Sequence, residues 1–116
     1  SIEGERNIQG FFMAYLSLCN YYIIAPELEL KHGYCVFFLL PNMTHYQSKH
    51  SYILELKYLS KSEYTEKKAQ EQWDEAVEQI NGYAVAPRVE ALRQGTQLHK
   101  IIIQFCGWDM MKMEEV

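Results

Sequence analysis

The order of hydrophobic and polar residues predicts helices and strands along the whole chain. In residues 5–19 the apolar side chains recur every three or four positions, which is the spacing of one helix face. Residues 63–84 repeat that spacing over a longer stretch. Residues 34–40 are instead continuously apolar, which is typical of a strand covered on both faces, and residues 99–106 contain a similar apolar run. The helical spacing and the continuous apolar runs together predict a domain that mixes helices with buried strands.

Turn residues and weaker patterns complete this order. Lys31-His32-Gly33 predicts a turn after the first strand, which Pro26 interrupts, and Gly95 predicts the end of a short helix. The remaining expected elements are strands over residues 21–30, 52–59 and 108–114 and a short helix over residues 88–94. The main elements therefore follow the order α-β-β-β-α-β-β, which predicts an α/β fold with a mixed central sheet flanked by helices on both faces.

Composition narrows the class of protein. A chain of 116 residues with 48% hydrophobic and 22% charged residues is typical of one soluble globular domain, residues 1–116, and not of a disordered protein. The net charge of −4 argues against a tight non-specific binder of nucleic acid, which is normally basic. The negative charge does not exclude a metal-dependent nuclease, because a metal site needs acidic ligands.

Cysteine and histidine usage predicts neither a disulfide framework nor a zinc site. The three cysteines are far apart and odd in number, and the four histidines have no metal-ligand spacing and are expected in loops and at strand ends. We therefore expect a reduced, cytoplasmic protein. No signal peptide is visible, and no apolar run reaches the ~18 residues that predict a membrane span. The chain begins at Ser1 and not at Met, which is compatible with a domain excised from a longer protein.

A pair of opposite charges stands out in the strand predicted over residues 52–59. Strand side chains alternate between faces, so Glu55 and Lys57 point the same way. Two charges on one face of an apolar strand carry a desolvation penalty, so such a pair usually has a reason. One reason is a metal-dependent nuclease site, in which the carboxylate holds a divalent cation beside an attacking water. The other is a structural ion pair at a strand end.

The arrangement of segments along the chain resembles the PD-(D/E)XK nuclease superfamily. Within it, the chain more closely resembles a bacterial branch whose members often follow an AAA-ATPase-like region. The resemblance covers essentially the whole chain. The segments that carry it are Gly4-Glu5-Arg6, Gln9-Gly10-Phe11-Phe12, Pro26-Glu27-Leu28-Glu29-Leu30, His32-Gly33-Tyr34, Ser51-Tyr52-Ile53-Leu54-Glu55-Leu56-Lys57-Tyr58, and Gln79-Ile80 with Tyr83. The resemblance implies a restriction-endonuclease-like fold and metal-dependent hydrolysis of phosphodiesters in nucleic acid, most simply DNA, with Mg²⁺ or Mn²⁺ as cofactor.

The resemblance also assigns roles to individual residues. It implies that Glu55 is a metal ligand and that Lys57 positions or polarises the nucleophilic water. Glu5 matches an acidic residue that supports the metal through water, with helix capping as its alternative role. Gln79 matches a residue that orients the site or the substrate, and Tyr83 would line the same wall. Gln79 and Tyr83 are alternatively ordinary helix neighbours, four residues apart.

Lysines beyond the charged strand extend the candidate substrate site. Lys61, Lys67 and Lys68 follow that strand closely, so one interpretation is that they meet the phosphates of the substrate, with Lys61 the nearest in sequence. The alternative is a solvated start of the long helix. In the last predicted strand, the apolar edge from Trp108 to Met113 favours a homodimer or docking onto an ATPase domain.

One position departs from the family pattern. The superfamily has an Asp on the second strand as its principal metal ligand, and the matching position here is Val36, whose side chain cannot bind a metal. Either the site is degenerate, leaving a catalytically inactive DNA-binding or protein-interaction module of an ATPase-associated system, or Glu27 or Glu29 takes over as the ligand. The resemblance implies that Val36 lies beside Glu55, and strand alternation then puts Cys35 on the opposite face.

Overall fold

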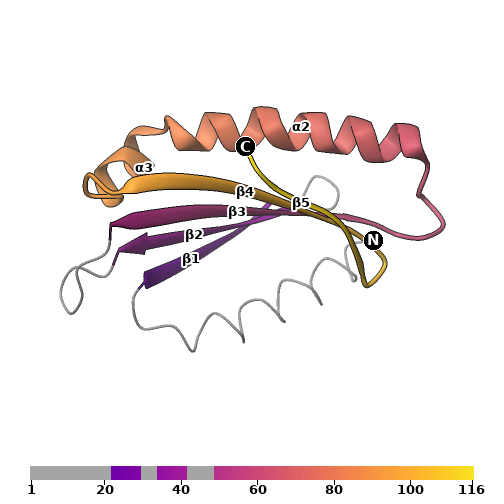
Figure 1. Ribbon diagram of the computed structural model, residues 1–116, viewed down its shortest axis with the longest axis horizontal. Coiled ribbons are helices and arrows are strands. Elements are labelled where there is room, and N and C mark those ends of the chain that lie inside the picture. The colour runs from indigo at the N-terminus through magenta and orange to yellow at the C-terminus, as the bar shows by residue number, and fades with distance from the viewer. Residues whose placement is uncertain (1–21, 30–33, 42–48) are drawn as a thin grey trace.

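A computed structural model describes residues 22–29, 34–41 and 49–116 (Figure 1). The helix predicted over residues 5–19 and the turn at residues 31–33 lie outside these ranges. The described elements are β1 (Tyr22–Glu29), β2 (Tyr34–Pro41), β3 (His50–Leu59), α2 (Glu66–Ala84), α3 (Pro87–Leu92), β4 (Gln97–Cys106) and β5 (Asp109–Glu115).

The five strands form one mixed sheet in the order β1-β2-β3-β4-β5. β3 and β4 are parallel, and the other neighbouring pairs are antiparallel. A parallel pair needs a crossover between its strands, and here α2 and α3 supply it. The prediction of a mixed sheet is therefore confirmed. Both helices lie on the same side of the sheet (Figure 1), and the helix expected on the other side falls among residues that are not described.

Pro26 does not interrupt the first strand, and that expectation was wrong. β1 continues through it, and Pro26 pairs with Phe37 of β2. Proline lacks a backbone N–H, but this matters little on a strand that has only one neighbour in the sheet. β1 occupies such an edge position in the described sheet, so the strand tolerates the proline.

The alternation predicted for β2 is confirmed by the packing of its side chains. Val36, Phe38 and Leu40 join the core cluster beneath α2 and α3, whereas Phe37 and Leu39 join a second cluster on the opposite face of the sheet. A strand that contributes to a core on each face has to be apolar throughout, which explains the continuous apolar run in the sequence.

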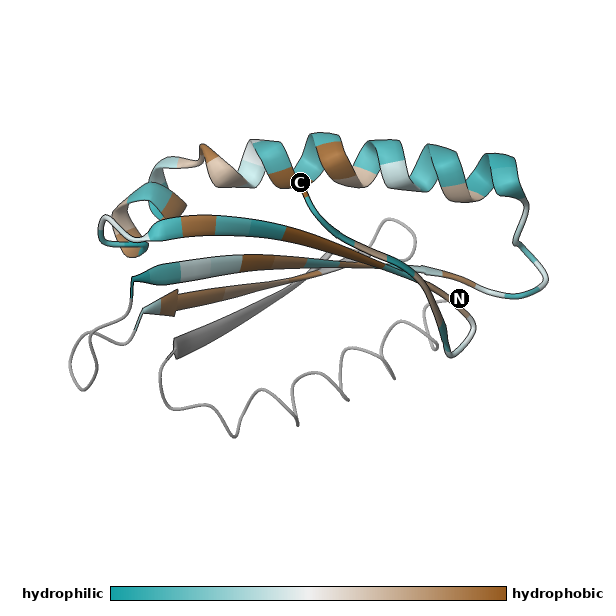
Figure 2. Ribbon diagram, in the orientation of Figure 1, coloured by the Kyte–Doolittle hydropathy of each residue, from teal (hydrophilic) through white to brown (hydrophobic). Residues whose placement is uncertain are grey.

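α2 begins later than predicted, because the polar residues before it form a turn and a cap. Glu63 donates its backbone N–H to the Ser60 hydroxyl, and the Thr65 hydroxyl accepts the backbone N–H of Lys68 as the N-cap. The buried residues of α2 recur every three or four positions. They are Ala69, Trp73, Ala76 and Ile80. The helix is otherwise mostly hydrophilic (Figure 2), so it packs on the sheet through this one stripe. None of the helices in the described part of the chain is long and apolar enough to cross a membrane.

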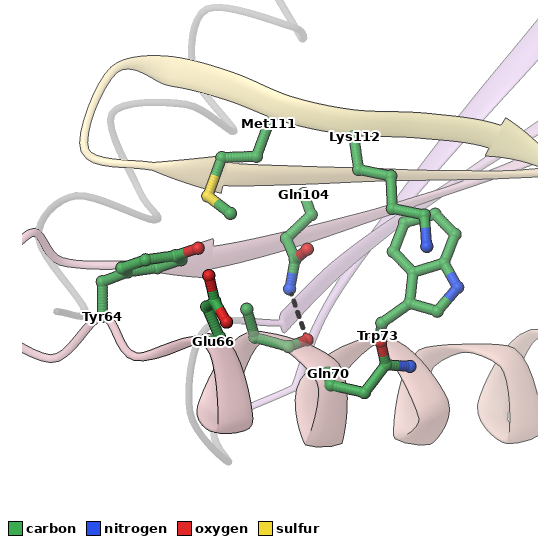
Figure 3. A pocket seen from close by; sticks show the side chains of 8 residues that line it. Tyr64, Glu66, Gln70, Trp73, Gln104, Met111 and Lys112 are labelled. Atoms are coloured by element: carbon green, nitrogen blue, oxygen red, sulfur yellow. Dashed lines mark hydrogen bonds between the residues drawn. The ribbon is translucent and has the colours of Figure 1, made fainter.

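A buried glutamine fixes α2 over β4. Gln104 Nε2 donates to the Ala69 carbonyl oxygen at 2.9 Å and to Gln72 Oε1 at 2.9 Å. Beside it, Lys112 of β5 places its ammonium 4.0 Å from the centre of the Trp73 ring, on the wall of a shallow hollow (Figure 3). Polar contacts of this kind set the position of the helix along the strands, and thereby the residues that α2 holds over β3.

β5 is the edge strand predicted from the end of the sequence. Around it Trp108, Met110 and Met113 are exposed by 69%, 57% and 57%. An exposed apolar edge favours association, so the predicted homodimer or docked ATPase domain stays a prediction about this edge.

Candidate functional site

Glu55 and Lys57 lie on the face of β3 that α2 covers. Their side chains are 0% and 2% exposed, and the neighbouring Ile53 on the same face belongs to the core cluster beneath the helix. The two charged residues therefore do not form an exposed ion pair at the strand end. They are buried at the centre of the sheet, where polar groups are strongly affected by their immediate neighbours.

A chain of hydrogen bonds connects Lys57 to α2. Lys57 Nζ donates to Gln79 Oε1 at 2.9 Å, and Gln79 Nε2 donates to Glu75 Oε1 at 3.1 Å. Glu75 was missed in the sequence reasoning. Its signal was present, because Glu75, Gln79 and Tyr83 are spaced four residues apart and so follow one face of α2. The structure thus brings together Glu55, Lys57 and Gln79 and adds an acid on the helix.

Glu55 is held in its neutral form. Burial raises the pKa of its carboxyl to about 8, the positive charge of Lys57 lowers it, and the negative charge of Glu75 raises it. Within the described part of the chain, neither carboxyl oxygen of Glu55 has a hydrogen-bond partner. An unpartnered buried carboxylate is costly, so the group keeps its proton at pH 7.

Val36 is the direct neighbour of Glu55 on the adjacent strand. The register of β2 and β3 pairs Val36 with Glu55, and it pairs Cys35 with Leu56. The predicted register is therefore confirmed. Val36 is fully buried and belongs to the apolar cluster beneath α2. The position where the family has an acidic ligand is thus filled by a packed hydrocarbon side chain.

The same cross-strand row continues to the edge of the sheet. Glu27 of β1 pairs with Val36, so the backbone positions of Glu27, Val36 and Glu55 lie in one line across three strands. Glu29 is two residues further along β1 and pairs with Tyr34. Of the two acids considered as substitutes for the missing ligand, Glu27 is therefore the one in register with Glu55.

A hollow of about 390 Å³ lies beside this row, between β3 and α2. Its lining residues are Lys57, Leu59, Lys68, Glu71, Gln72 and Glu75. Lys57 thus borders a space that a ligand can enter, whereas Glu55 is not part of the lining. Two lysines and two glutamates face this hollow, so its charge is balanced and not strongly positive.

The other predicted site residues are further from this hollow or outside the described residues. The Tyr83 ring meets Phe38 edge-on, with 5.8 Å between ring centres, and packs against the apolar cluster. The exposed Lys61 lies alongside Gly107, where a Cβ would come within 3.1 Å of its Cε. Glu5 is not among the described residues. The substrate roles of Tyr83 and Lys61 and the metal role of Glu5 stay predictions.

The bond between Lys57 and Gln79 gives the first testable expectation. Gln79→Leu removes the amide that accepts from the buried ammonium, and it should lower the free energy of unfolding by about 1–3 kcal/mol. Urea unfolding measures this value. The matched control is Gln70→Leu on the same helix, because Gln70 is exposed and its side-chain amide donates to Asp74 on the surface. Equal losses in the two variants would mean that the bond to Lys57 contributes nothing.

Comparison with known proteins adds the family. A family model for the PD-(D/E)XK nuclease superfamily matches residues 3–115. The chain belongs to this superfamily. The resemblance seen in the sequence is confirmed at that level, and membership in the PD-(D/E)XK superfamily indicates a nuclease-like function. No curated protein and no solved structure gives a significant match.

PD-(D/E)XK nucleases typically use divalent metals, so the donor atoms of this chain can be tested against one. Mg²⁺ takes oxygen ligands, usually with one or two ionised carboxylates. Among residues 22–29, 34–41 and 49–116, no group of three or more His, Cys, Asp or Glu side chains is placed to hold a metal ion. Glu55 itself is protonated and has Val36 as its neighbour on β2, and Glu75 is bonded to Gln79, so the described donors do not fit Mg²⁺ or Mn²⁺.

Proposed function

We propose that this chain is a nucleic acid-binding PD-(D/E)XK domain in which metal-dependent phosphodiester cleavage has been lost. The observation that carries the proposal is the pairing of Val36 with Glu55. A second carboxylate at position 36 would share a cation with Glu55, and the cation would keep both acids ionised. With valine there, burial dominates the pKa of Glu55 and the group stays protonated.

Lys57 and Gln79 support the binding part of the proposal. Lys57 keeps its hydrogen bond to Gln79 and borders the hollow next to α2, together with Lys68. Ammonium groups at such a hollow suit the phosphates of a nucleic acid backbone. Glu71 and Glu75 on the same wall oppose them, and the whole chain carries a net charge of −4. We therefore infer weak, salt-sensitive binding, with DNA as the favoured partner on the strength of the family resemblance.

The biological setting is part of the same proposal. The sequence resembles a bacterial branch that often follows an AAA-ATPase-like region, so we propose that the domain serves an ATPase-associated system. The exposed apolar residues around β5, Trp108, Met110 and Met113, are the surface we assign to docking on that region or on a second copy.

A second candidate function is retained cleavage with a substitute ligand. Its support is the cross-strand row, which aligns Glu27 with Val36 and Glu55. In this alternative Glu27 supplies the acidic group that position 36 lacks. The two candidates differ in a simple way, because only the second requires Glu27 and Glu55 for activity.

End-labelled single-stranded and duplex DNA, with RNA for comparison, tests the two candidates. The proposal expects retarded migration in EDTA and no cleavage in millimolar Mg²⁺ or Mn²⁺. Metal-dependent cleavage that disappears in both Glu55→Gln and Glu27→Gln would establish the second candidate. Cleavage that survives both substitutions would come from a contaminant, and absence of DNA and RNA binding would leave the protein-interaction role.

Salt dependence identifies the binding surface. Lys68→Gln should weaken DNA binding and reduce the slope of log affinity against log salt concentration by about 0.7–0.9, as for one lost phosphate contact. Lys67→Gln is the matched control, because Lys67 is highly exposed and does not line the hollow. Its Nζ lies 4.0 Å from Glu71 Oε1. Equal slopes for the two variants would mean that the hollow does not contact the backbone.

A further inference from the structure

A second hollow lies between α2 and the hairpin that β4 and β5 form. We call it the β5 hollow. Its volume is about 330 Å³, and its walls include Tyr64, Trp73, Gln104, Met111 and Lys112. Ligand sites in proteins usually measure about 300–1,000 Å³, so this hollow has room for one small ring system. None of these five residues lines the hollow beside Lys57.

A β-bulge in β5 turns two consecutive side chains toward the β5 hollow. Gln104 pairs with Lys112 and Phe105 pairs with Met110, so Met111 is an extra residue between the two pairs. Consecutive strand residues normally point to opposite faces. Met111 and Lys112 nevertheless both line the hollow, whereas Phe105, the partner of Met110, packs on the opposite face of the sheet. Bulges recur beside functional sites because they re-aim a side chain in this way.

Gln104 presents a buried hydrogen-bond acceptor to the β5 hollow. The residue is 2% exposed, and its Nε2 donates to the Ala69 carbonyl oxygen and to Gln72 Oε1. A backbone carbonyl only accepts, so the nitrogen of the amide has to lie on that side. Among the described residues Oε1 has no hydrogen-bond partner, yet it is not sealed from solvent as the carboxyl oxygens of Glu55 are. Oε1 is therefore placed to accept from a ligand.

The walls around Gln104 suit a flat ring. Figure 3 shows Tyr64 and Met111 on one side of Gln104 and Trp73 with Lys112 on the other. Tyr64 and Met111 are exposed by 37% and 38%, so the phenol ring and the thioether are both open to a stacked aromatic group. The Trp73 ring already carries the Lys112 ammonium, which leaves Tyr64 and Met111 as the stacking surface.

The charges of the β5 hollow favour a neutral ligand. Glu66 and Lys112 are the charged residues of its lining, so the lining carries no net charge. A phosphate entering the hollow would meet the Glu66 carboxylate and the carbonyl oxygen of Gln104, both of which repel an anion. An uncharged ring that carries an N–H or amino group would instead donate to Gln104 Oε1.

We propose that the β5 hollow binds one unpaired nucleobase of a nucleic acid strand. The N–H or amino group of the base donates to Gln104 Oε1, and its face stacks on Tyr64 and Met111. This inference rests on the proposed function, because nucleic acid binding supplies the ligand. It adds a preference for unpaired bases, since a base in a duplex has to leave its partner and its stack before it can enter a pocket.

Matched ligands test the inference on the unsubstituted chain. A short labelled oligo(dC) and a strand of the same length built from abasic nucleotides have the same backbone charge, but only the first offers bases. Fluorescence anisotropy should show that oligo(dC) binds about 5–100-fold more tightly, as for one stacked base. A duplex with one bulged cytosine should likewise bind more tightly than the fully paired duplex.

Substitutions then locate the base. Tyr64→Ala should weaken the binding of oligo(dC) by about 5–100-fold and leave that of the abasic strand unchanged. Trp108→Ala is the matched control, because Trp108 is a more exposed aromatic residue that does not line the hollow. Met111→Ala should also weaken oligo(dC) binding, and Met110→Ala on the opposite face should not. Lys68→Gln should weaken both strands alike, since it removes a phosphate contact of the other hollow.

The outcomes separate this inference from the proposed function. Equal affinities for oligo(dC) and the abasic strand would overturn the inference and leave nucleic acid binding intact. Equal losses in Tyr64→Ala and Trp108→Ala would also overturn it. Absence of binding to every strand, single or duplex, would overturn the proposed function and the inference together.

Discussion

Val36→Asp should destabilise the metal-free protein and make its stability depend on divalent metal. The substitution places a second carboxyl beside Glu55 in a fully buried apolar row. A buried carboxyl left without a hydrogen-bond partner costs about 1–3 kcal/mol even when it is protonated, so the melting temperature should fall in EDTA. Mg²⁺ or Mn²⁺ should restore much of this loss, because an ion at 100 times its dissociation constant contributes about 2.7 kcal/mol.

Val36→Asn separates the charge from the change of shape. Asparagine has the size of aspartate and is also polar, so it should lower the melting temperature without any recovery in metal. Cleavage of DNA by the Val36→Asp protein in Mn²⁺ would show that a single residue accounts for the lost activity. An aspartate variant that ignores millimolar metal and cuts nothing would mean that the site has degenerated beyond position 36.

The second large effect is a fall in stability between acid and neutral pH caused by Glu55. Its pKa is about 8 in the folded protein and near 4.5 when unfolded, so the folded state binds more protons between these values. The contribution of Glu55 to stability is fully present below about pH 4.5 and is lost as the pH rises through 8. The free energy of unfolding should fall by up to about 1.4 kcal/mol per pH unit in this window.

Glu55→Gln should remove this dependence, because its amide stays neutral at every pH. Urea unfolding at several pH values between 5 and 8.5 gives the free energy of unfolding of each protein as a function of pH. The two plots should diverge, with the variant becoming the more stable protein as the pH rises. Glu78→Gln, at an exposed position on α2, is the control that should run parallel to the unsubstituted chain. Parallel curves for Glu55→Gln would mean that Glu55 is ionised when folded.

Much of the sheet could be predicted from the sequence, since β2 and β4 contain continuous apolar runs. The register of Val36 opposite Glu55 could be anticipated because the family pattern matches Val36 to the ligand position and alternation assigns its face. The Pro26 expectation failed because the effect of a proline depends on whether its strand has one neighbour or two, which is a property of the sheet and not of the segment.

The candidate site was only partly predictable, for a similar reason. Glu55, Lys57 and Gln79 could be named from their order along the chain, but the role of Glu75 depends on how α2 is seated over β3. The neutral state of Glu55 depends on burial by residues distant in sequence, which a local pattern does not contain. The 2.8 Å contact between His50 Nδ1 and His99 Nε2 likewise depends on the parallel register of β3 and β4, which no spacing rule describes.

Calorimetric titration of Mg²⁺ into the unsubstituted chain at pH 7 tests the central claim most directly. Mg²⁺ is the suitable probe because it prefers oxygen ligands and binds poorly to imidazole, so histidines do not interfere. The proposal predicts no binding at millimolar concentration for the unsubstituted chain and one bound ion for Val36→Asp. One ion bound by the unsubstituted chain, and lost in Glu55→Gln, would show that Glu55 holds a metal despite Val36 and would contradict the proposed loss of cleavage.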